Sequence, residues 1–272
     1  MSSSAPRSPF SVGGQPGAPP KLAATTILVR DAADGLQVLL MRRSGKSGFM
    51  GGAYVFPGGK VDPRDAEPTS WPGAPSPDAI ARMCGAAVLA PEDAAAARTL
   101  LAAGAREALE EAGVQLALDA LVPWGHWITP SAEPRRFDTW FFVGALAADV
   151  VVRADDHEAV ELGWFAPSAA LAAAAEGAMF LPPPTLLTLA ELAGFTHAEA
   201  VLTAARARAL PGIMPKLDLT GGRVVIVFPW DSGYAALEGE ALPAFDPAAL
   251  TPALRATSRV ELVGDRWVAS VG

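Results

Sequence analysis

The sequence predicts one α+β domain at 21–272, preceded by a disordered leader at 1–20. Its 272 residues correspond to one large or two small domains at about 150 residues per domain. Hydrophobic residues make up 51% of the chain, which is enough for a sizeable core. Strand-like and helix-like segments follow one another without regular alternation, and this favours α+β over a doubly wound parallel sheet.

A hairpin of two strands is predicted at the start of the domain. Segments 22–30 and 36–42 have strand composition and flank a turn at 31–35. A shorter strand is expected at 53–56, directly before Pro57-Gly58-Gly59.

An insertion is expected at about 66–97, because prolines cluster between 68 and 77. One short helix is predicted inside it, near 80–89. A longer helix is predicted from Ala94 to Gly113, since glycine favours the position that ends a helix.

The second half mixes both kinds of element. Strands are predicted at 121–128, 137–146 and 159–165. Helices are predicted from Pro167, at 184–194 and at 197–210. The chain returns to strands at 223–228, 259–263 and 266–270, the last two joined by a Gly264-Asp265 turn. We interpret about 182–272 as a C-terminal extension.

Charge and composition limit the kinds of partner that the protein is expected to bind. The net charge of −8 argues against a general nucleic-acid binder, which needs a basic surface. No apolar run of about 18 residues is present, so no membrane span is expected. The single cysteine, Cys84, excludes an intrachain disulfide and favours a reducing compartment. We expect a cytoplasmic protein that binds a small-molecule nucleotide; a homo-oligomer is left open.

Three glutamates on the predicted 94–113 helix indicate a metal site. Glu107, Glu110 and Glu111 are spaced i, i+3, i+4, so they share one helix face and repel each other. They also lie near the helix C-terminus, where the macrodipole disfavours anions. A divalent cation would relieve both penalties, and oxygen ligands suit Mg²⁺ or Mn²⁺. The alternative is an ordinary exposed face in which Arg106 pairs with Glu110.

The chain around these glutamates resembles the Nudix hydrolases, whose box is G-x5-E-x7-R-E-U-x-E-E-x-G-U, where U is apolar. Gly59 in the Phe56-Pro57-Gly58-Gly59-Lys60 segment matches the opening glycine, and 106–114 match the second half position by position. The resemblance implies the Nudix fold, an α/β/α sandwich around a mixed sheet. It also implies that Glu107, Glu110, Glu111 and the Gly59 carbonyl bind metal, while Arg106 orients the carboxylates.

The box departs from the family pattern in two ways. Gly59 and Arg106 lie 47 positions apart instead of 14, an excess of 33 residues. The first box glutamate falls at Asp65, and the sequence leaves open whether Asp65, Glu67 or Glu92 takes that role.

An interrupted box resembles the coenzyme A and acyl-coenzyme A diphosphatase branch of the Nudix hydrolases. Segments 124–130, 134–142, 213–215 and 228–231 are also similar to that branch. The resemblance implies cleavage of a pyrophosphate bond, giving 3′,5′-ADP and phosphopantetheine or its acyl derivative. The alternatives are a pyrophosphatase for ADP-ribose, a dinucleotide or a nucleotide sugar, and a catalytically silent ligand-binding module.

Further site residues follow from this interpretation. Basic side chains expected to contact substrate phosphates are Arg42, Arg43, Lys46, Arg135 and Arg136. The general base is expected among the box glutamates, Glu158 and Glu161, and Glu158 is the favoured loop residue. For each, the alternative is an ordinary solvated side chain. His126, on a predicted strand, is interpreted as structural.

Overall fold

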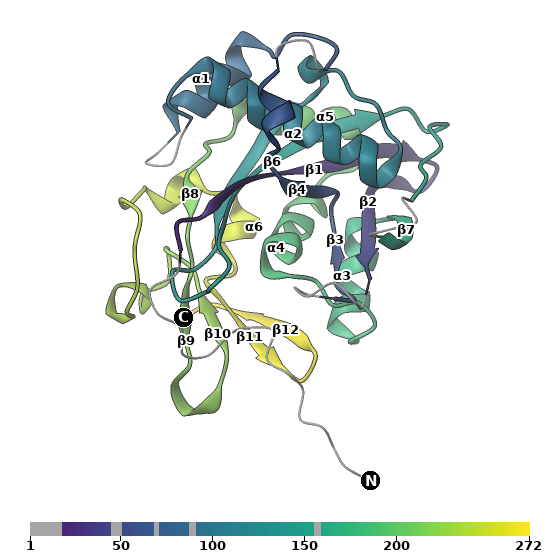
Figure 1. The fold of residues 1–272 in the computed structure, drawn as a ribbon. Helices are drawn as coiled ribbons and strands as arrows, with labels where there is room; N and C mark the ends of the chain where they lie inside the picture. Colours follow the sequence, from purple (N-terminus) through teal and green to yellow (C-terminus); the bar gives the residue numbers. More distant parts are fainter. Residues whose placement is uncertain (1–17, 45–50, 68–70, 87–90, 155–158) are drawn as a thin grey trace.

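An eight-stranded mixed sheet lies at the centre of the computed structural model, which describes residues 18–44, 51–67, 71–86, 91–154 and 159–272 (Figure 1). Its strands are β1 (Lys21–Ala32), β2 (Gly35–Arg43), β3 (Tyr54–Val55), β4 (Gly58–Lys60), β5 (Val122–Ile128), β6 (Phe137–Leu146), β7 (Ala159–Phe165) and β8 (Gly212–Ile213). The α-helices are α1 (Pro77–Gly85), α2 (Ala94–Ala112), α3 (Pro167–Ala175), α4 (Pro183–Leu192), α5 (Ala198–Ala207) and α6 (Pro252–Arg255).

Strand β1 organises this sheet. It pairs in parallel with β6 along 21–30. Along its other edge it pairs antiparallel first with β4, at 23–25, and then with β2, at 29–32. The edge of β1 is therefore shared by β4 and β2, which pair with different parts of it. Strand β4 contains Gly59, the first residue of the box.

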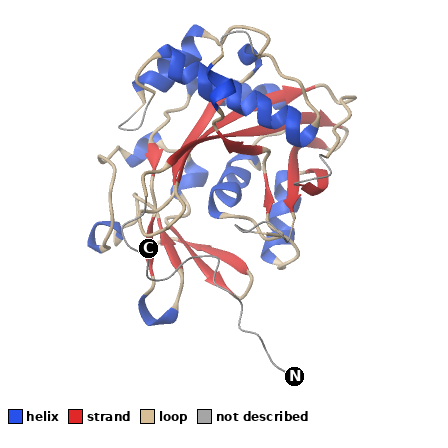
Figure 2. Cartoon of the chain, in the orientation of Figure 1, coloured by secondary structure: helices blue, strands red, loops and turns tan. Residues whose placement is uncertain are grey.

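Helices cover both faces of the sheet (Figure 2). On one face, Leu28 and Phe142 pack in a buried cluster with the apolar side of α2. On the other face, Ile27 and Phe141 pack in a second cluster with α3, α4 and α5. Alternate residues of β1 and β6 thus enter opposite cores, as the two-residue period of a strand requires. This is the α/β/α Nudix sandwich that the sequence predicts.

Helix α2 lies very close to the sheet. Thr26 Oγ1 donates to the Gly104 carbonyl at 2.8 Å, and a Cβ atom at Gly104 would lie 3.0 Å from that hydroxyl. The Asp93 side chain accepts from the Ala96 N–H and caps the first turn. Gly113 ends the helix with a φ of 68°, which confirms the predicted end.

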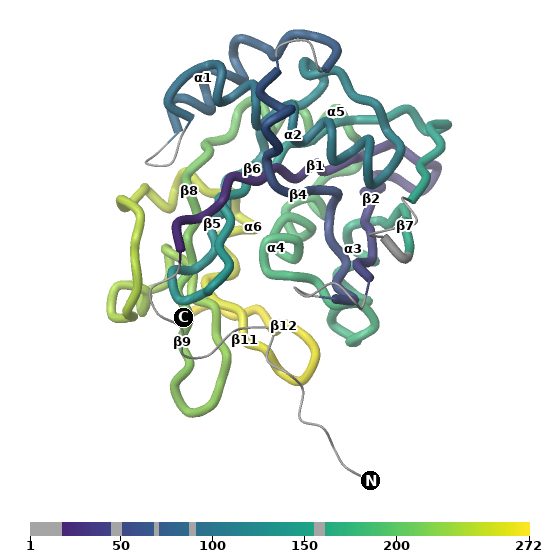
Figure 3. Tube along the Cα trace, viewed as in Figure 1, coloured from purple at the N-terminus to yellow at the C-terminus, as the bar shows by residue number. Residues whose placement is uncertain are grey.

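The insertion differs in detail from its prediction. Helix α1 runs from Pro77 to Gly85 and so begins before the expected 80–89, because Pro77 occupies the first turn, where its missing N–H costs nothing. Residues 87–90 lie outside the described residues. In Figure 3, α1 lies at the top of the molecule, on the opposite side from the C-terminal strands.

The C-terminal extension forms a second sheet in the order β12-β11-β10-β9. Its strands are β9 (Lys216–Asp218), β10 (Val225–Val227), β11 (Arg259–Val263) and β12 (Arg266–Ser270). Ile226, Phe228, Val260 and Trp267 join the core cluster that contains Ile27 of the main sheet. Within the described part of the chain, none of the helices has the length and apolar character needed to span a bilayer.

Candidate active site

The three box glutamates lie on the last two turns of α2 and differ in exposure. Glu107 and Glu111 are buried, with exposed fractions of 9% and 4%. The Glu110 side chain is 45% exposed. All three line one large groove, so the helix face that the sequence predicted does carry them to a common surface.

Arg106 connects two of these carboxylates. Its Nη1 donates to Glu107 Oε1 at 2.7 Å and to Glu110 Oε2 at 2.8 Å, while its Nη2 donates to the Lys60 carbonyl at 2.8 Å. Burial alone lowers the pKa of Arg106, but the hydrogen bond to Asp65 and the charge of Glu107 outweigh it and raise that pKa above its ordinary value. Arg106 is therefore a permanent cation that fixes the positions of both glutamates.

Asp65 occupies the place that the sequence left open. Its side chain is fully buried and accepts from Arg106 Nε at 2.9 Å and Nη2 at 3.1 Å. The Asp62 N–H donates to Asp65 Oδ2 at 2.7 Å, which fixes the carboxylate from its other side. Glu67 and Glu92, the two other sequence-based candidates, are exposed. Asp65 thus orients Arg106 across the insertion.

The two glycines of β4 bring the backbone against the glutamates. The Gly58 N–H donates to Glu111 Oε2 at 2.7 Å. A Cβ atom at Gly59 would lie 2.4 Å from Glu107 Oε1, and one at Gly58 would lie 2.7 Å from the Ala24 carbonyl oxygen. Glycine is required at both positions because any side chain would displace the carboxylate or the strand.

The groove beside the box has a volume of about 1360 Å³. Its floor contains alternate residues of three paired strands: Lys21, Ala23 and Thr25 from β1, Gly58 and Lys60 from β4, and Phe137, Thr139 and Phe141 from β6. Lys21 and Lys60 were missed by sequence reasoning. The signal that would have found them is the two-residue period of β1 and β4, which places them on the face that carries Gly58.

The predicted phosphate-binding residues separate into three groups. Arg43 and the exposed Arg135 line the groove. Arg42 is absent from its lining; it precedes Arg43 on β2 and its guanidinium lies 6.0 Å from the centre of the Tyr54 ring. Lys46 lies outside the described residues.

Arg136 also borders the groove, but its guanidinium has protein partners. It donates to Glu240 Oε2 at 2.9 Å and to the Thr129 carbonyl at 3.2 Å. Its side chain is 3% exposed, so it anchors the C-terminal extension to the loop after β5.

Neither of the two base candidates near the start of β7, Glu158 and Glu161, is among the described residues that line the groove. Glu158 lies outside the described residues. Glu161 is exposed, pairs in register with Arg42, and accepts from the Tyr54 hydroxyl at 3.4 Å. Glu133, buried in the groove wall, was not singled out from the sequence. His126 is buried, stacks on Trp140 and binds Asp138 Oδ1 at 2.5 Å through Nε2, as a structural residue does.

The donors at the box fit a divalent cation in their chemistry. Three carboxylates and the backbone of Gly59 supply only hard oxygen atoms, the type that Mg²⁺ and Mn²⁺ prefer. The lack of a side chain at Gly59 lets the Glu107 carboxylate lie directly against the backbone, where a Cβ atom would overlap it. Among the described residues, no three acidic, histidine or cysteine side chains already form a closed metal cage. Glu107 and Glu110 are instead bound by Arg106, and Glu111 by the Gly58 N–H.

Comparisons with known proteins show what the chain is similar to. A family model described as the NUDT19 Nudix domain matches residues 107–192, which begin at the second half of the box. The crystal structure of a Nudix hydrolase from Alicyclobacillus acidocaldarius matches with a TM-score of 0.55 and 25% identity, over 68% of this chain and 96% of that one. The fold is that of the Nudix hydrolases, and the box residues are arranged as the resemblance implies.

The chain is also similar to two curated relatives. The human protein, named acyl-coenzyme A diphosphatase NUDT19, is 28% identical over 278 residues, which cover 74% of this chain and 73% of that protein. The Xenopus laevis protein of the same name is 26% identical over 73% of this chain and 71% of its own length.

Proposed function

We propose that this protein hydrolyses the pyrophosphate bond of coenzyme A or an acyl-coenzyme A, releasing 3′,5′-ADP and phosphopantetheine or acyl-phosphopantetheine. The observation that carries the proposal is the joined box: Arg106 contacts Asp65, Glu107 and Glu110 at once, although the insertion separates its two halves. The names of the two similar proteins support the choice of substrate.

The metal site is part of this proposal. We infer that Glu107, Glu110, Glu111 and the Gly59 carbonyl would hold Mg²⁺ or Mn²⁺. A bound divalent ion supplies positive charge for the diphosphate and lowers the pKa of a coordinated water. Arg106, next to the site, keeps both glutamates correctly directed.

Substrate binding falls to the basic residues of the groove. The diphosphate and the 3′-phosphate of coenzyme A are anionic, and Lys21, Arg43, Lys60 and Arg135 are the cations available along the groove wall and floor. Hydrolysis adds one water to the diphosphate. One P–O bond of the bridging oxygen breaks, and each product keeps one of the two phosphates as a phosphate ester. Glu158 stays a predicted base for this water.

A substrate panel tests the proposal. Purified protein is incubated with Mg²⁺ or Mn²⁺ and with coenzyme A, acyl-coenzyme A, ADP-ribose, a diadenosine polyphosphate or a nucleotide sugar, and the products are identified by mass. The proposal expects 3′,5′-ADP as the dominant nucleotide product. Preferential cleavage of ADP-ribose or a nucleotide sugar would contradict coenzyme A as the substrate and favour the alternative pyrophosphatase. Binding without turnover of any compound would indicate a catalytically silent module.

A further inference from the structure

The far wall of the groove comes from the C-terminal extension. Pro215, which follows β8, and Ile226 of β10 line the same groove as the box glutamates. They share this groove with Trp127 and Ile128 of β5 and with residues 182–185 at the start of α4. Every one of these side chains except that of Thr185 is apolar, and the neighbouring β5–β6 loop adds the charged residues Glu133, Arg135 and Arg136 to the lining of the groove.

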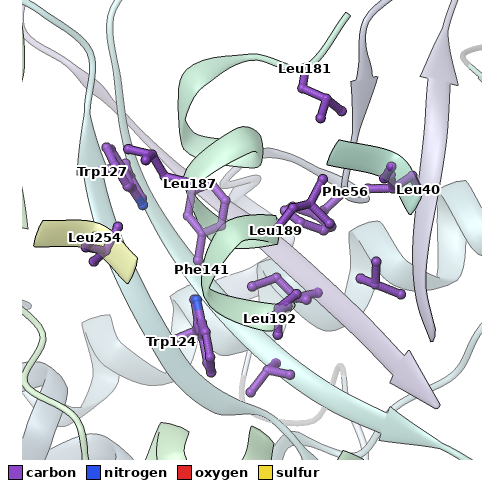
Figure 4. Close-up of a cluster of buried hydrophobic side chains, with 14 of the residues drawn as sticks. Leu40, Phe56, Trp124, Trp127, Phe141, Leu181, Leu187, Leu189, Leu192 and Leu254 are labelled. Carbon is purple, nitrogen blue, oxygen red and sulfur yellow. The ribbon is translucent and has the colours of Figure 1, made fainter. Parts of the chain in front are cut away.

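The main sheet and α4 support this apolar end from within. Trp127, Phe141 and Leu187 belong to one buried cluster, which Figure 4 shows where α4 lies against the sheet. Ile226 joins the same cluster and is 4% exposed. Wall residues with such support hold their positions, so the apolar surface is preformed.

Hydrogen bonds fix the extension in place beside the groove. Arg136 binds Glu240, and the Glu240 N–H donates to Ser131 Oγ at 3.0 Å. Within the extension itself, Lys216 Nζ donates to the carbonyls of Leu237 at 2.8 Å and Tyr234 at 3.3 Å. A preformed wall spares a ligand the entropy of ordering it.

The groove is also larger than a nucleotide diphosphate alone requires. Ligand pockets usually measure about 300–1,000 Å³, and this groove measures about 1360 Å³. Because the apolar residues and the box line one continuous groove, a substrate whose diphosphate lies at the glutamates can extend a long, uncharged arm to the apolar end.

We propose that Pro215, Ile226 and Trp127 form a subsite for the acyl chain of an acyl-coenzyme A, with Ile226 setting the chain length that fits. This inference rests on the proposed function, since it takes the nucleotide end from there. The C-terminal extension is then a specificity element of the catalytic domain.

Equilibrium binding without metal tests the subsite independently of turnover. Calorimetry in EDTA gives dissociation constants for coenzyme A and for a saturated series from acetyl- to decanoyl-coenzyme A, kept below their micelle concentrations. Each methylene that enters the subsite should tighten binding by about fourfold, until the chain outgrows it. Dissociation constants that do not change with chain length would overturn the inference.

Variants of one strand locate the effect. Ile226→Phe should weaken binding of the longest bound chain by about tenfold and leave coenzyme A unchanged. Ile226→Val is a milder change and should let a longer acyl chain bind. It tests the same residue if Ile226→Phe does not fold. Val227→Ala is the matched control, because Val227 is equally buried on β10 but belongs to a separate cluster. If the Ile226 and Val227 variants changed the dependence of binding on acyl-chain length equally, the assignment of Ile226 to the subsite would be wrong.

Turnover with metal separates this inference from the proposed function. Chain-length-dependent binding without hydrolysis would overturn the proposed function and leave the subsite. Hydrolysis of coenzyme A with flat chain-length binding would overturn the subsite and leave the proposed function.

Discussion

Arg106 and Asp65 form a buried, two-point ion pair between residues 41 positions apart, with Nε–Oδ1 at 2.9 Å and Nη2–Oδ2 at 3.1 Å. The pair joins the two ends of the interrupted box. An arginine held this way cannot rotate away from the glutamates that it also contacts.

Substitution of Asp65 tests this link. Asp65→Asn should reduce apparent Mn²⁺ affinity or kcat by about 10–100-fold, as loss of a residue that orients metal ligands does. Asp65→Glu, which restores the usual box residue, should retain more activity. The measurement is activity against Mn²⁺ concentration, with melting curves. Glu67→Gln is the control, and a loss as large as that of Asp65→Asn would contradict the assignment.

Gly59 provides a steric test. Gly59→Ala would place a Cβ atom 2.4 Å from Glu107 Oε1 and displace that carboxylate, so we expect a tenfold or larger loss of kcat, about 1.4 kcal/mol, in a folded protein. Gly85→Ala is the matched control, since a Cβ atom there meets nothing within 4 Å. Unchanged kinetics in Gly59→Ala would show that Glu107 need not lie where the structure has it.

Arg135 and Arg136 are neighbours with different expected roles. Arg135→Ala should raise KM without lowering the melting temperature, because this exposed side chain lines the groove. Arg136→Ala should lower the melting temperature, since it leaves Glu240 and the Thr129 carbonyl without their buried donor. Steady-state kinetics and calorimetry on both variants distinguish the roles; the reverse pattern would contradict them.

The environment of Asp231 predicts that the free energy of unfolding falls in acid. Its burial raises its pKa, but hydrogen bonds from Arg259, Ser258 and the Gly233 N–H outweigh this and lower the pKa below its ordinary value. The stabilisation is therefore present above the ordinary aspartate pKa and is lost as pH falls through the lower folded value. Asp231→Asn should remove about 2–3 kcal/mol at neutral pH and flatten this part of the profile.

Urea denaturation from neutral to acid pH measures this effect. Asp265→Asn, in the exposed turn between β11 and β12, is the control and should leave the profile unchanged. The account of Asp231 would be wrong if Asp231→Asn and the wild type lost stability equally in acid.

Local sequence signals predicted much of the fold. The 22–30 and 36–42 hairpin and the helix ending at Gly113 are confirmed, because composition and end residues act locally. The parallel pairing of β1 with β6 and the two-residue strand β8 were not predicted, since both depend on contacts between distant segments. No periodicity within either segment encodes such a partner.

The site shows the same division. Box spacing placed the glutamates on one helix face, but only tertiary structure selects Asp65 over Glu67, because the choice depends on which carboxylate faces Arg106. Arg42 and Arg43 were indistinguishable in sequence, and the alternation of β2 separates them. The cytoplasmic location, the oligomeric state and the roles of Glu158 and Lys46 stay predictions.

The central claim is metal-dependent hydrolysis of coenzyme A at the box carboxylates. The most direct measurement is the release of 3′,5′-ADP from coenzyme A by the wild type and Glu111→Gln, each with Mn²⁺ or with EDTA. We expect wild-type turnover only with the ion, and at least a hundredfold less from Glu111→Gln, a loss of about 2.7 kcal/mol of transition-state stabilisation. Undiminished turnover in EDTA, or full activity of folded Glu111→Gln, would contradict the claim.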